Sequence, residues 1–261
     1  MMTDRHTGEV PRQHLRSPVS PIFFLLLAIT LCGGALATGT SDLIVTIGVV
    51  LLVLGGWAVS LCLHEFGHAA VAYRGGDTSV ANKGYLTLDI RRYLNPMLSF
   101  GLPLIFLIIG GIPLPGGAVW INNWALRSRL IRSMVSLAGP LINLVLGIIL
   151  AVAAQIVSMP VGLLIGLSYL ALVQVLAFLL NILPIPGLDG FGVLEPYLSK
   201  QTREMADKIR PWAPLAFFVL LLGVPEVSSA LFSAGSVLFT LVGGNTQAAF
   251  AGYSQFLFWR R

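Results

Sequence analysis

The stretch from residue 61 to residue 70, LCLHEFGHAA, places three ionisable side chains inside a hydrophobic segment. It holds His64 and His68, two of the four histidines of the chain, with Glu65 between them. Residues four apart on a helix share a face, so both imidazoles can bind one metal ion. Glu65 projects from roughly the same side and can contact a water molecule on that ion. The stretch therefore predicts a metal site with a neighbouring base.

The alternative is a set of polar side chains that only hydrogen-bond to one another within a helix bundle. An ionisable group at the centre of a spanning helix costs ~2.5–3.5 kcal/mol on insertion scales. Placing Glu65 beside two histidines without a cation would be unfavourable, so the metal site is the stronger interpretation.

The composition predicts that this stretch lies in a membrane. The chain has 261 residues, of which 56% are hydrophobic and 10% charged, and its mean hydropathy is +0.86. A soluble domain carries about a quarter charged residues. The net charge of +5 comes from short basic clusters between apolar runs, as in cytoplasmic loops, so we expect no nucleic-acid partner.

The hydrophobic runs predict an all-α polytopic membrane protein with about six transmembrane helices. These spans are expected at 19–38, 43–73, 133–157, 161–183, 212–224 and 227–243. A re-entrant segment at 95–123 keeps all the basic clusters on one side. The N-terminus and the opening of the site are then cytoplasmic in a multi-pass protein.

Outside the long runs, residues 84–92, GYLTLDIRR, alternate apolar and polar side chains. This period predicts a short β element at the membrane surface, to which an extended peptide can add as a strand; an ordinary loop is the alternative. We expect a cytoplasmic N-terminal tail at 1–18, a single domain at 19–243 with its core at about 43–200, and a C-terminal tail at 244–261.

A catalytic zinc ion usually has three protein ligands, so a third ligand is needed. His6 and His14 lie in the polar N-terminal segment and are poor candidates. The stretch 181–190, NILPIPGLDG, breaks a predicted helix with prolines and glycines and carries Asp189. Such a turn can direct the carboxylate towards the two histidines. The alternative is that Asp189 only caps a turn in a loop.

A third polar feature is Asn143, an amide early in the predicted span 133–157. It can hydrogen-bond a substrate backbone or an oxyanion. An interhelical hydrogen bond is an equally good interpretation.

Together the three motifs resemble the site-2 protease family of intramembrane zinc metalloproteases, in its compact bacterial type without PDZ or CBS domains. H-E-x-x-H appears at 64–68, G-P-x-x-N at 139–143 and N-x-x-P-x-P-x-L-D-G at 181–190, so the likeness covers roughly residues 45 to 200. It implies one Zn²⁺ per chain held by His64, His68 and Asp189, with Glu65 as catalytic base.

The resemblance also implies a protein of the bacterial cell membrane that cleaves transmembrane protein substrates in the lipid bilayer, as in regulated intramembrane proteolysis. A catalytically silent zinc-binding adaptor is the main alternative, but a site that only binds has no need of Glu65. A metal transporter would favour several ligands along a path. The sequence does not indicate an oligomeric state.

Overall fold

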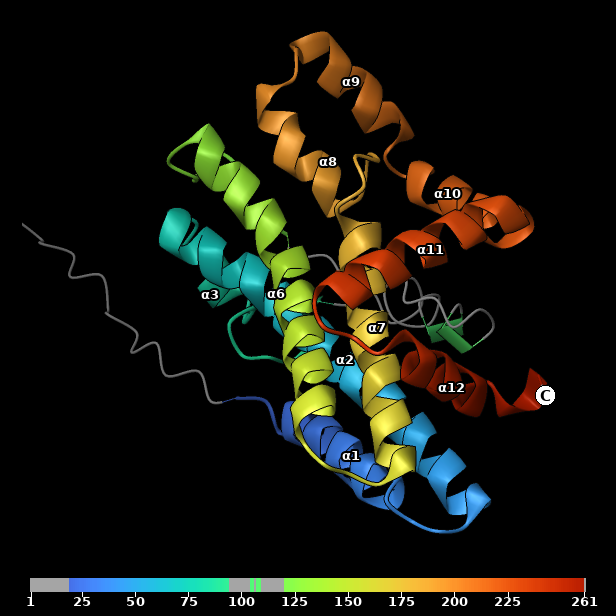
Figure 1. Ribbon diagram of the computed structural model, residues 1–261. Coiled ribbons are helices and arrows are strands. Elements are labelled where there is room, and N and C mark those ends of the chain that lie inside the picture. The colour runs from blue at the N-terminus through green and yellow to red at the C-terminus, as the bar shows by residue number, and fades with distance from the viewer. Residues whose placement is uncertain (1–18, 94–103, 106, 109–119, 261) are drawn as a thin grey trace, which may run out of the picture.

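Helices make up the regular structure in the described part of the chain, and their lengths follow the hydrophobic runs (Figure 1). The computed structural model describes residues 19–93, 104–105, 107–108 and 120–260. The predicted tail at 1–18 and most of the predicted re-entrant segment at 95–123 lie outside these residues. The elements are α1 (Pro21–Leu36), α2 (Asp42–Gly75), α3 (Ser79–Asn82), α4 (Ile90–Tyr93), α6 (Arg129–Ile156), α7 (Val161–Asn181), α8 (Asp189–Leu194), η2 (Glu195–Tyr197), α9 (Lys200–Ile209), α10 (Ala213–Gly223), α11 (Pro225–Leu241), α12 (Thr246–Phe256) and η3 (Phe258–Arg260).

Helix α7 lies at the centre of the bundle, with α2, α6, α11 and α12 packed around it (Figure 1). Its buried side chains include Tyr169, Leu172 and Leu176, each almost completely inaccessible to solvent. An apolar helix without a polar face is typical of a helix surrounded by other helices. The segment predicted as the C-terminal tail, 244–261, contains α12, whose Phe256 is buried beside Tyr169.

Glycines bring α1 and α2 into backbone contact. A Cβ atom at Gly33 would lie 2.3 Å from the backbone nitrogen of Leu52, and one at Gly48 would lie 2.3 Å from that of Ala37. Small residues at a helix interface allow this close approach, which is a common form of helix packing in membranes.

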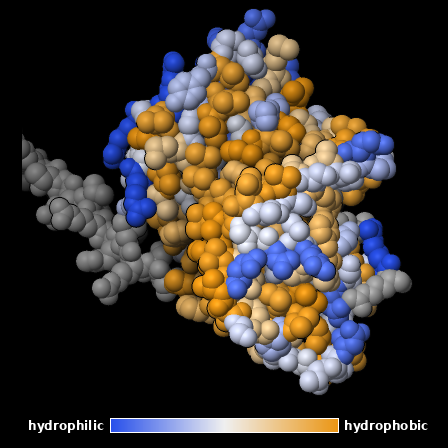
Figure 2. All heavy atoms as spheres, viewed as in Figure 1, coloured by the Kyte–Doolittle hydropathy of each residue, from blue (hydrophilic) through white to orange (hydrophobic). Residues whose placement is uncertain are grey.

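One side of α6 is exposed among the residues that the structure describes. Figure 2 shows a broad hydrophobic area across the face on which α6 lies. The exposed apolar side chains of α6 recur every three, four or seven residues, which places them in one stripe along the helix. They are Leu130, Met134, Leu141, Val145, Ile149, Val152 and Ile156. A stripe of this length on a 28-residue helix is suited to contact with lipid.

The structure does not support six full membrane spans. In the residues that it describes, α2, α6 and α7 are long and apolar enough to cross a membrane, and α10 with α11 would make a fourth span if counted together. Helix α1 has 16 residues and is therefore about 24 Å long, shorter than the ~30 Å hydrocarbon core.

Helices α10 and α11 do not form two spans because each is short and they meet at a bend of 95°. The bend lies at Val224, whose backbone is extended, directly before Pro225 at the start of α11. Proline disfavours the helical conformation of the residue before it, so the helix ends there. The sequence marked this boundary correctly, but the pieces have only 11 and 17 residues.

The predicted strand over 84–92 is wrong, since these residues form a turn followed by the start of α4. Gly84 and Leu88 have positive φ angles of 74° and 55°, which a strand does not contain. The apolar side chains of the alternating pattern do not line one face of a strand. Leu86 packs near the end of α2, and Leu88 packs against the core around Trp57.

Asp89 stabilises this turn. Its carboxylate accepts hydrogen bonds from the backbone N–H of Arg91 at 3.1 Å and from the Arg91 guanidinium at 2.8 Å. These bonds hold the pKa of the Asp89 carboxyl below its usual value. The segment therefore offers no strand edge to a peptide.

The glycine contact between α1 and α2 gives a first prediction. Gly33→Ala should destabilise the protein by about 1–3 kcal/mol, because the new methyl group overlaps the backbone of α2 and no side chain can move to make room. Thermal unfolding in detergent micelles measures the effect. The matched control is Gly34→Ala, where the nearest atom, on Leu163, is 3.7 Å away. Equal melting temperatures for the two variants would contradict the prediction.

Candidate metal centre

Helix α2 supplies two imidazoles and a carboxylate to the interior of the bundle. His64, Glu65 and His68 are each at most 6% exposed. The helical spacing of four residues brings the Nε2 atoms of His64 and His68 to 3.0 Å from each other. The two rings therefore face one point, which is the arrangement that the spacing of the histidines predicts.

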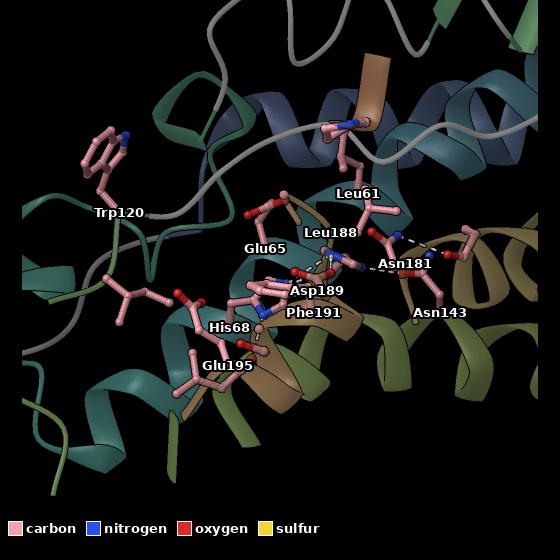
Figure 3. A pocket seen from close by; sticks show the side chains of 18 of the residues that line it. Leu61, Glu65, His68, Trp120, Asn143, Asn181, Leu188, Asp189, Phe191 and Glu195 are labelled. Atoms are coloured by element: carbon pink, nitrogen blue, oxygen red, sulfur yellow. Dashed lines mark hydrogen bonds and ion pairs between the residues drawn. The ribbon is translucent and has the colours of Figure 1, made fainter. Parts of the chain in front are cut away.

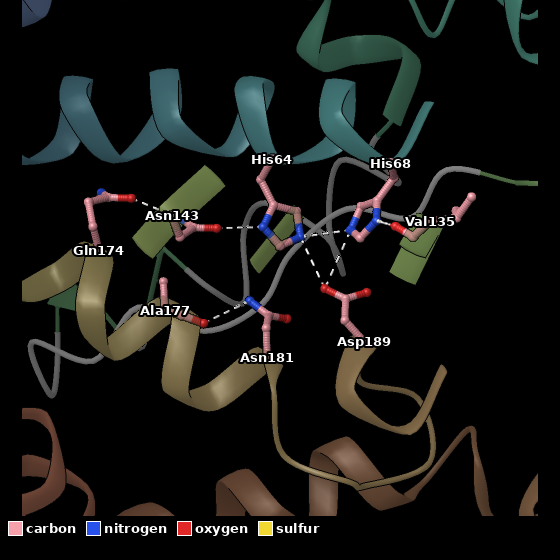
Figure 4. A network of polar contacts seen from close by, with 8 residues as sticks. All are labelled: His64, His68, Val135, Asn143, Gln174, Ala177, Asn181 and Asp189. Carbon is pink, nitrogen blue, oxygen red and sulfur yellow. Dashed lines mark hydrogen bonds and ion pairs between the residues drawn. The ribbon is translucent and has the colours of Figure 1, made fainter. Parts of the chain in front are cut away.

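The turn after α7 brings Asp189 to the same point. Gly187 has a φ of +98°, and a Cβ atom at Gly190 would lie 2.0 Å from the carbonyl oxygen of Ile182, so both positions suit glycine. Asp189 Oδ2 is 3.2 Å from His64 Nε2 and 3.4 Å from His68 Nε2 (Figure 4). Asp189 thus begins α8, and its carboxylate also faces the two rings rather than only capping a turn.

One ligand atom from each of His64, His68 and Asp189 lies within 4.8 Å of the other two. In the part of the chain that the structure describes, no other three His, Cys, Asp or Glu side chains converge in this way. A single compact cluster differs from the succession of ligands that a metal transport path would need.

The hydrogen bonds of the two imidazoles determine which nitrogen faces the cluster with a lone pair. His68 Nδ1 is 2.6 Å from the carbonyl oxygen of Val135, which can only accept, so Nδ1 carries the proton. His64 Nδ1 donates to Asn143 Oδ1 (Figure 4). In neutral rings both Nε2 atoms then present lone pairs to each other and to the Asp189 carboxylate. Oδ2 of Asp189 is buried and has no hydrogen-bond donor.

Three lone pairs that face one another in an apolar bundle repel unless a cation lies between them. Two imidazole nitrogens and one carboxylate oxygen form a common ligand set for catalytic zinc. The residues present therefore fit a zinc ion, held by one atom each of His64, His68 and Asp189.

Asn143 connects the metal cluster to α7. Its Oδ1 accepts from His64, and its Nδ2 donates to Gln174 Oε1 at 2.8 Å, with both residues buried. This is the interhelical hydrogen bond that the sequence left open for Asn143. The sequence analysis did not identify Gln174, because a single glutamine on an apolar helix forms no motif. The one sign of its role was a polar side chain at a position where an apolar one is expected.

Gly139 provides the space in which the two imidazoles lie. A Cβ atom at this position would be 2.3 Å from His68 Nε2 and 2.5 Å from His64 Nε2. Helix α6 therefore passes directly beside the metal cluster only because residue 139 has no side chain.

The cluster faces a cavity of about 590 Å³, which is large enough for a short peptide segment (Figure 3). Glu65 lines this cavity next to the two histidines, as expected for a base that acts on a water molecule at the metal. Asn181 also lines it, with its Nδ2 bonded to the carbonyl oxygen of Ala177. Trp120 and the Glu195–Arg210 ion pair lie further along the wall.

This combination of apolar helices, an H-E-x-x-H helix and a converging aspartate defines the class as a membrane zinc metalloprotease. Comparison with known proteins agrees. The chain is 44% identical over 245 residues to the "Putative zinc metalloprotease Rip2" of Mycobacterium tuberculosis, covering 92% of this chain and 94% of that protein. It is 42% identical over 253 residues to the protein of the same name from Mycolicibacterium smegmatis, covering 95% and 96%.

A more distant relative is the "Putative zinc metalloprotease YwhC" of Bacillus subtilis, which is 31% identical over 175 residues, 62% of this chain and 76% of that protein. No protein-family model and no solved structure gives a significant match. The chain belongs to the site-2 protease family.

The contact of Gly139 with the histidines gives a second prediction. Gly139→Ala should remove most of the metal bound to the purified protein, because the methyl group occupies the space of both Nε2 atoms. Elemental analysis measures metal per chain, and circular dichroism verifies that the helices are retained. Gly223→Ala at the end of α10 is the control, since a Cβ atom there would have no neighbour within 4 Å. Full metal content in Gly139→Ala would contradict this account.

The hydrogen bonds of Asn143 give a third prediction. Asn143→Ala should weaken metal binding about 10–100-fold, because the His64 ring loses the acceptor that fixes its tautomer and orientation. Gln174→Leu should act in the same direction through Asn143. Zinc competition against a chromogenic chelator measures the affinity. If Asn143 acts only on the substrate or an oxyanion, the affinity stays unchanged and only the cleavage rate falls.

Proposed function

We propose that this protein is an intramembrane zinc metalloprotease that hydrolyses peptide bonds in or near the transmembrane segments of other membrane proteins. The observation that carries the proposal is the convergence of three lone pairs, from His64, His68 and Asp189, beside a buried Glu65 in a bundle of apolar helices. A binding-only adaptor needs the three ligands but has no use for the glutamate.

His64, His68 and Asp189 would hold one Zn²⁺ per chain and leave a coordination position open towards the cavity. Bound zinc supplies a Lewis acid that activates water and polarises the scissile carbonyl. The carbonyl of Val135 and the amide of Asn143 each accept a hydrogen bond from an Nδ1 atom, which keeps both Nε2 atoms directed towards the metal. The chain thereby fixes the ligand geometry before any substrate enters.

Glu65 acts as the general base in this mechanism. It takes a proton from the attacking water and passes it to the nitrogen of the departing amine, as acid–base catalysis at a peptide bond requires. Its position one residue after His64 keeps it on the cavity side of α2. Asn181 lines the same cavity, and its Oδ1 is available to accept a hydrogen bond from the substrate chain, whereas Asn143 is engaged with His64 and Gln174.

The substrate is proposed to be a single transmembrane helix that unwinds locally. The peptide bonds of an intact helix are shielded by its own hydrogen bonds and side chains, so an extended segment must enter the cavity. The basic clusters place the N-terminus and the opening of the site on the cytoplasmic side in this proposal. Release of membrane-tethered regulators and removal of signal-peptide remnants are both compatible with such a site.

The test compares the wild type with Glu65→Gln at matched expression, in cells of the source organism. The variant should retain bound zinc but lose cleavage by a factor of 10² or more, because a general base contributes about 10²–10⁴ in rate. Single-span proteins should then accumulate uncut only in the variant strain, which quantitative proteomics of membrane fractions and of new peptide ends can detect.

The same comparison distinguishes the alternatives. A catalytically silent adaptor predicts identical membrane proteomes for the two strains under all growth and stress conditions, with zinc bound in both proteins. Loss of zinc in Glu65→Gln would mean that Glu65 is a ligand and would contradict the assigned roles. Removal of zinc from the wild type by a chelator should abolish cleavage, and added Zn²⁺ should restore it.

A further inference from the structure

A buried carboxylate outside the metal cluster connects the catalytic helix to the wall of the cavity. Asp77 follows α2 directly and is 1% exposed. Its Oδ1 accepts hydrogen bonds from the backbone N–H of Ser79 at 3.0 Å and from the Ser79 hydroxyl at 2.6 Å. These two bonds are local and fix the short turn into α3.

The second oxygen of Asp77 makes a bond of a different kind. Asp77 Oδ2 accepts from the backbone N–H of Asn122 at 2.7 Å, across 45 residues of sequence. The neighbours Trp120, Ile121 and Asn123 line the cavity that contains the metal cluster. Burial of a carboxylate is costly unless hydrogen bonds compensate it, so the bond to Asn122 is part of what makes this burial tolerable.

Other contacts join this segment to the end of α3, and the residues after it to the end of α2. Lys83 Nζ donates to the carbonyl oxygen of Trp120 at 2.7 Å. The backbone N–H of Arg127 donates to the carbonyl oxygen of Gly75 at 3.1 Å. A Cβ atom at Gly76 would lie 2.6 Å from the carbonyl oxygen of Ala125, so the two backbones approach as closely as glycine permits.

The side chain of Ile121 adds an apolar anchor. It packs against a buried cluster that includes Ala69 and Ala72, in the turn of α2 that follows His68. The segment from Trp120 to Asn123, which we call the rim segment, therefore lies at a position defined by the same helix that carries the metal ligands. Figure 3 shows Trp120 at the edge of the cavity, away from the metal cluster.

We propose that Asp77 is a positioning residue for peptide cleavage, which fixes the rim segment as the wall against which the substrate backbone is held. This inference rests on the proposed protease function. A wall that holds the substrate backbone contributes to binding in the ground state and the transition state alike, so its displacement should raise KM more than it lowers kcat. Without Asp77 the rim segment keeps its apolar anchor but loses the bond that sets its distance from α2.

The test measures cleavage of a purified single-span substrate in detergent by Asp77→Ala, with Ser79→Ala as the matched control. Asp77→Ala should lower kcat/KM at least tenfold, mainly through a higher KM, while zinc per chain is unchanged. Ser79→Ala removes only the local hydroxyl bond to Oδ1 and should stay within about twofold of the wild type. Asp77→Asn keeps one acceptor oxygen and should lie between the two.

A second residue keeps the proposal testable if Asp77→Ala fails to fold. Lys83 is exposed, so Lys83→Met should leave the fold intact while it removes the bond to Trp120. It should also raise KM, whereas Lys200→Met on α9, which only pairs with Glu204 at 3.8 Å, should not. Unchanged KM in both Asp77→Ala and Lys83→Met, or equal loss in Ser79→Ala, would overturn the proposal.

Binding in a Glu65→Gln background separates this inference from the proposed function. Substrate affinity can be measured there without turnover, and Asp77→Ala should weaken it at least fivefold relative to Ser79→Ala. If neither the wild type nor Glu65→Gln cleaves the substrate, the proposed protease function is contradicted, whatever the Asp77 variants do. If the wild type cleaves but Asp77→Ala and Ser79→Ala bind and cleave alike, only the positioning role of Asp77 is lost.

Discussion

The convergence of three lone-pair atoms at one point in an apolar bundle is the constraint on which the rest of this structure depends. Two imidazole nitrogens and a carboxylate oxygen at 3.0–3.4 Å, all presenting lone pairs, are repulsive neighbours without a cation. The surrounding helices therefore have to hold all three atoms against that repulsion. Each of the helices α2, α6 and α7 and the turn after α7 contributes a specific backbone or side-chain feature to this task.

Helix α6 shows how the sequence spacing serves the site. Val135, Gly139 and Asn143 are four residues apart, so they lie on one face, opposite two histidines that are also four apart. The carbonyl of Val135 orients one ring, the amide of Asn143 orients the other, and Gly139 leaves the space in which both Nε2 atoms meet. One helical period thus matches ligands on α2 to their supports on α6, and a shift of either helix by one residue would break all three contacts.

Much of the site was predictable because side-chain chemistry encodes it: a glutamate and two histidines in an apolar run, and an aspartate in a turn rich in proline and glycine. The supports were harder to predict. The backbone carbonyl that orients His68 could belong to any residue type, so valine at position 135 does not reveal it. Gln174 and Asp77 are single polar residues without a motif. The strand over 84–92 was mispredicted because its apolar residues pack into two separate clusters from a turn. Span number was overestimated because three short apolar runs were each counted as a full span, although α1, α10 and α11 have only 16, 11 and 17 residues.

The metal ligands of α2 lie in the half of this long helix that is nearer its C-terminal end. The helix has 34 residues, or about 51 Å, so it exceeds the ~30 Å hydrocarbon core. His64 is the twenty-third residue of the helix, about 33 Å from its start, and the turn with Asp77 lies about 20 Å beyond His64. The ligands lie among apolar helices, yet they also line a cavity of about 590 Å³ through which water and a peptide segment can approach them. The rim segment is tied by Asp77 to the same end of α2, so under the proposed function one helix end positions both the metal ligands and the wall along which we propose the substrate chain lies.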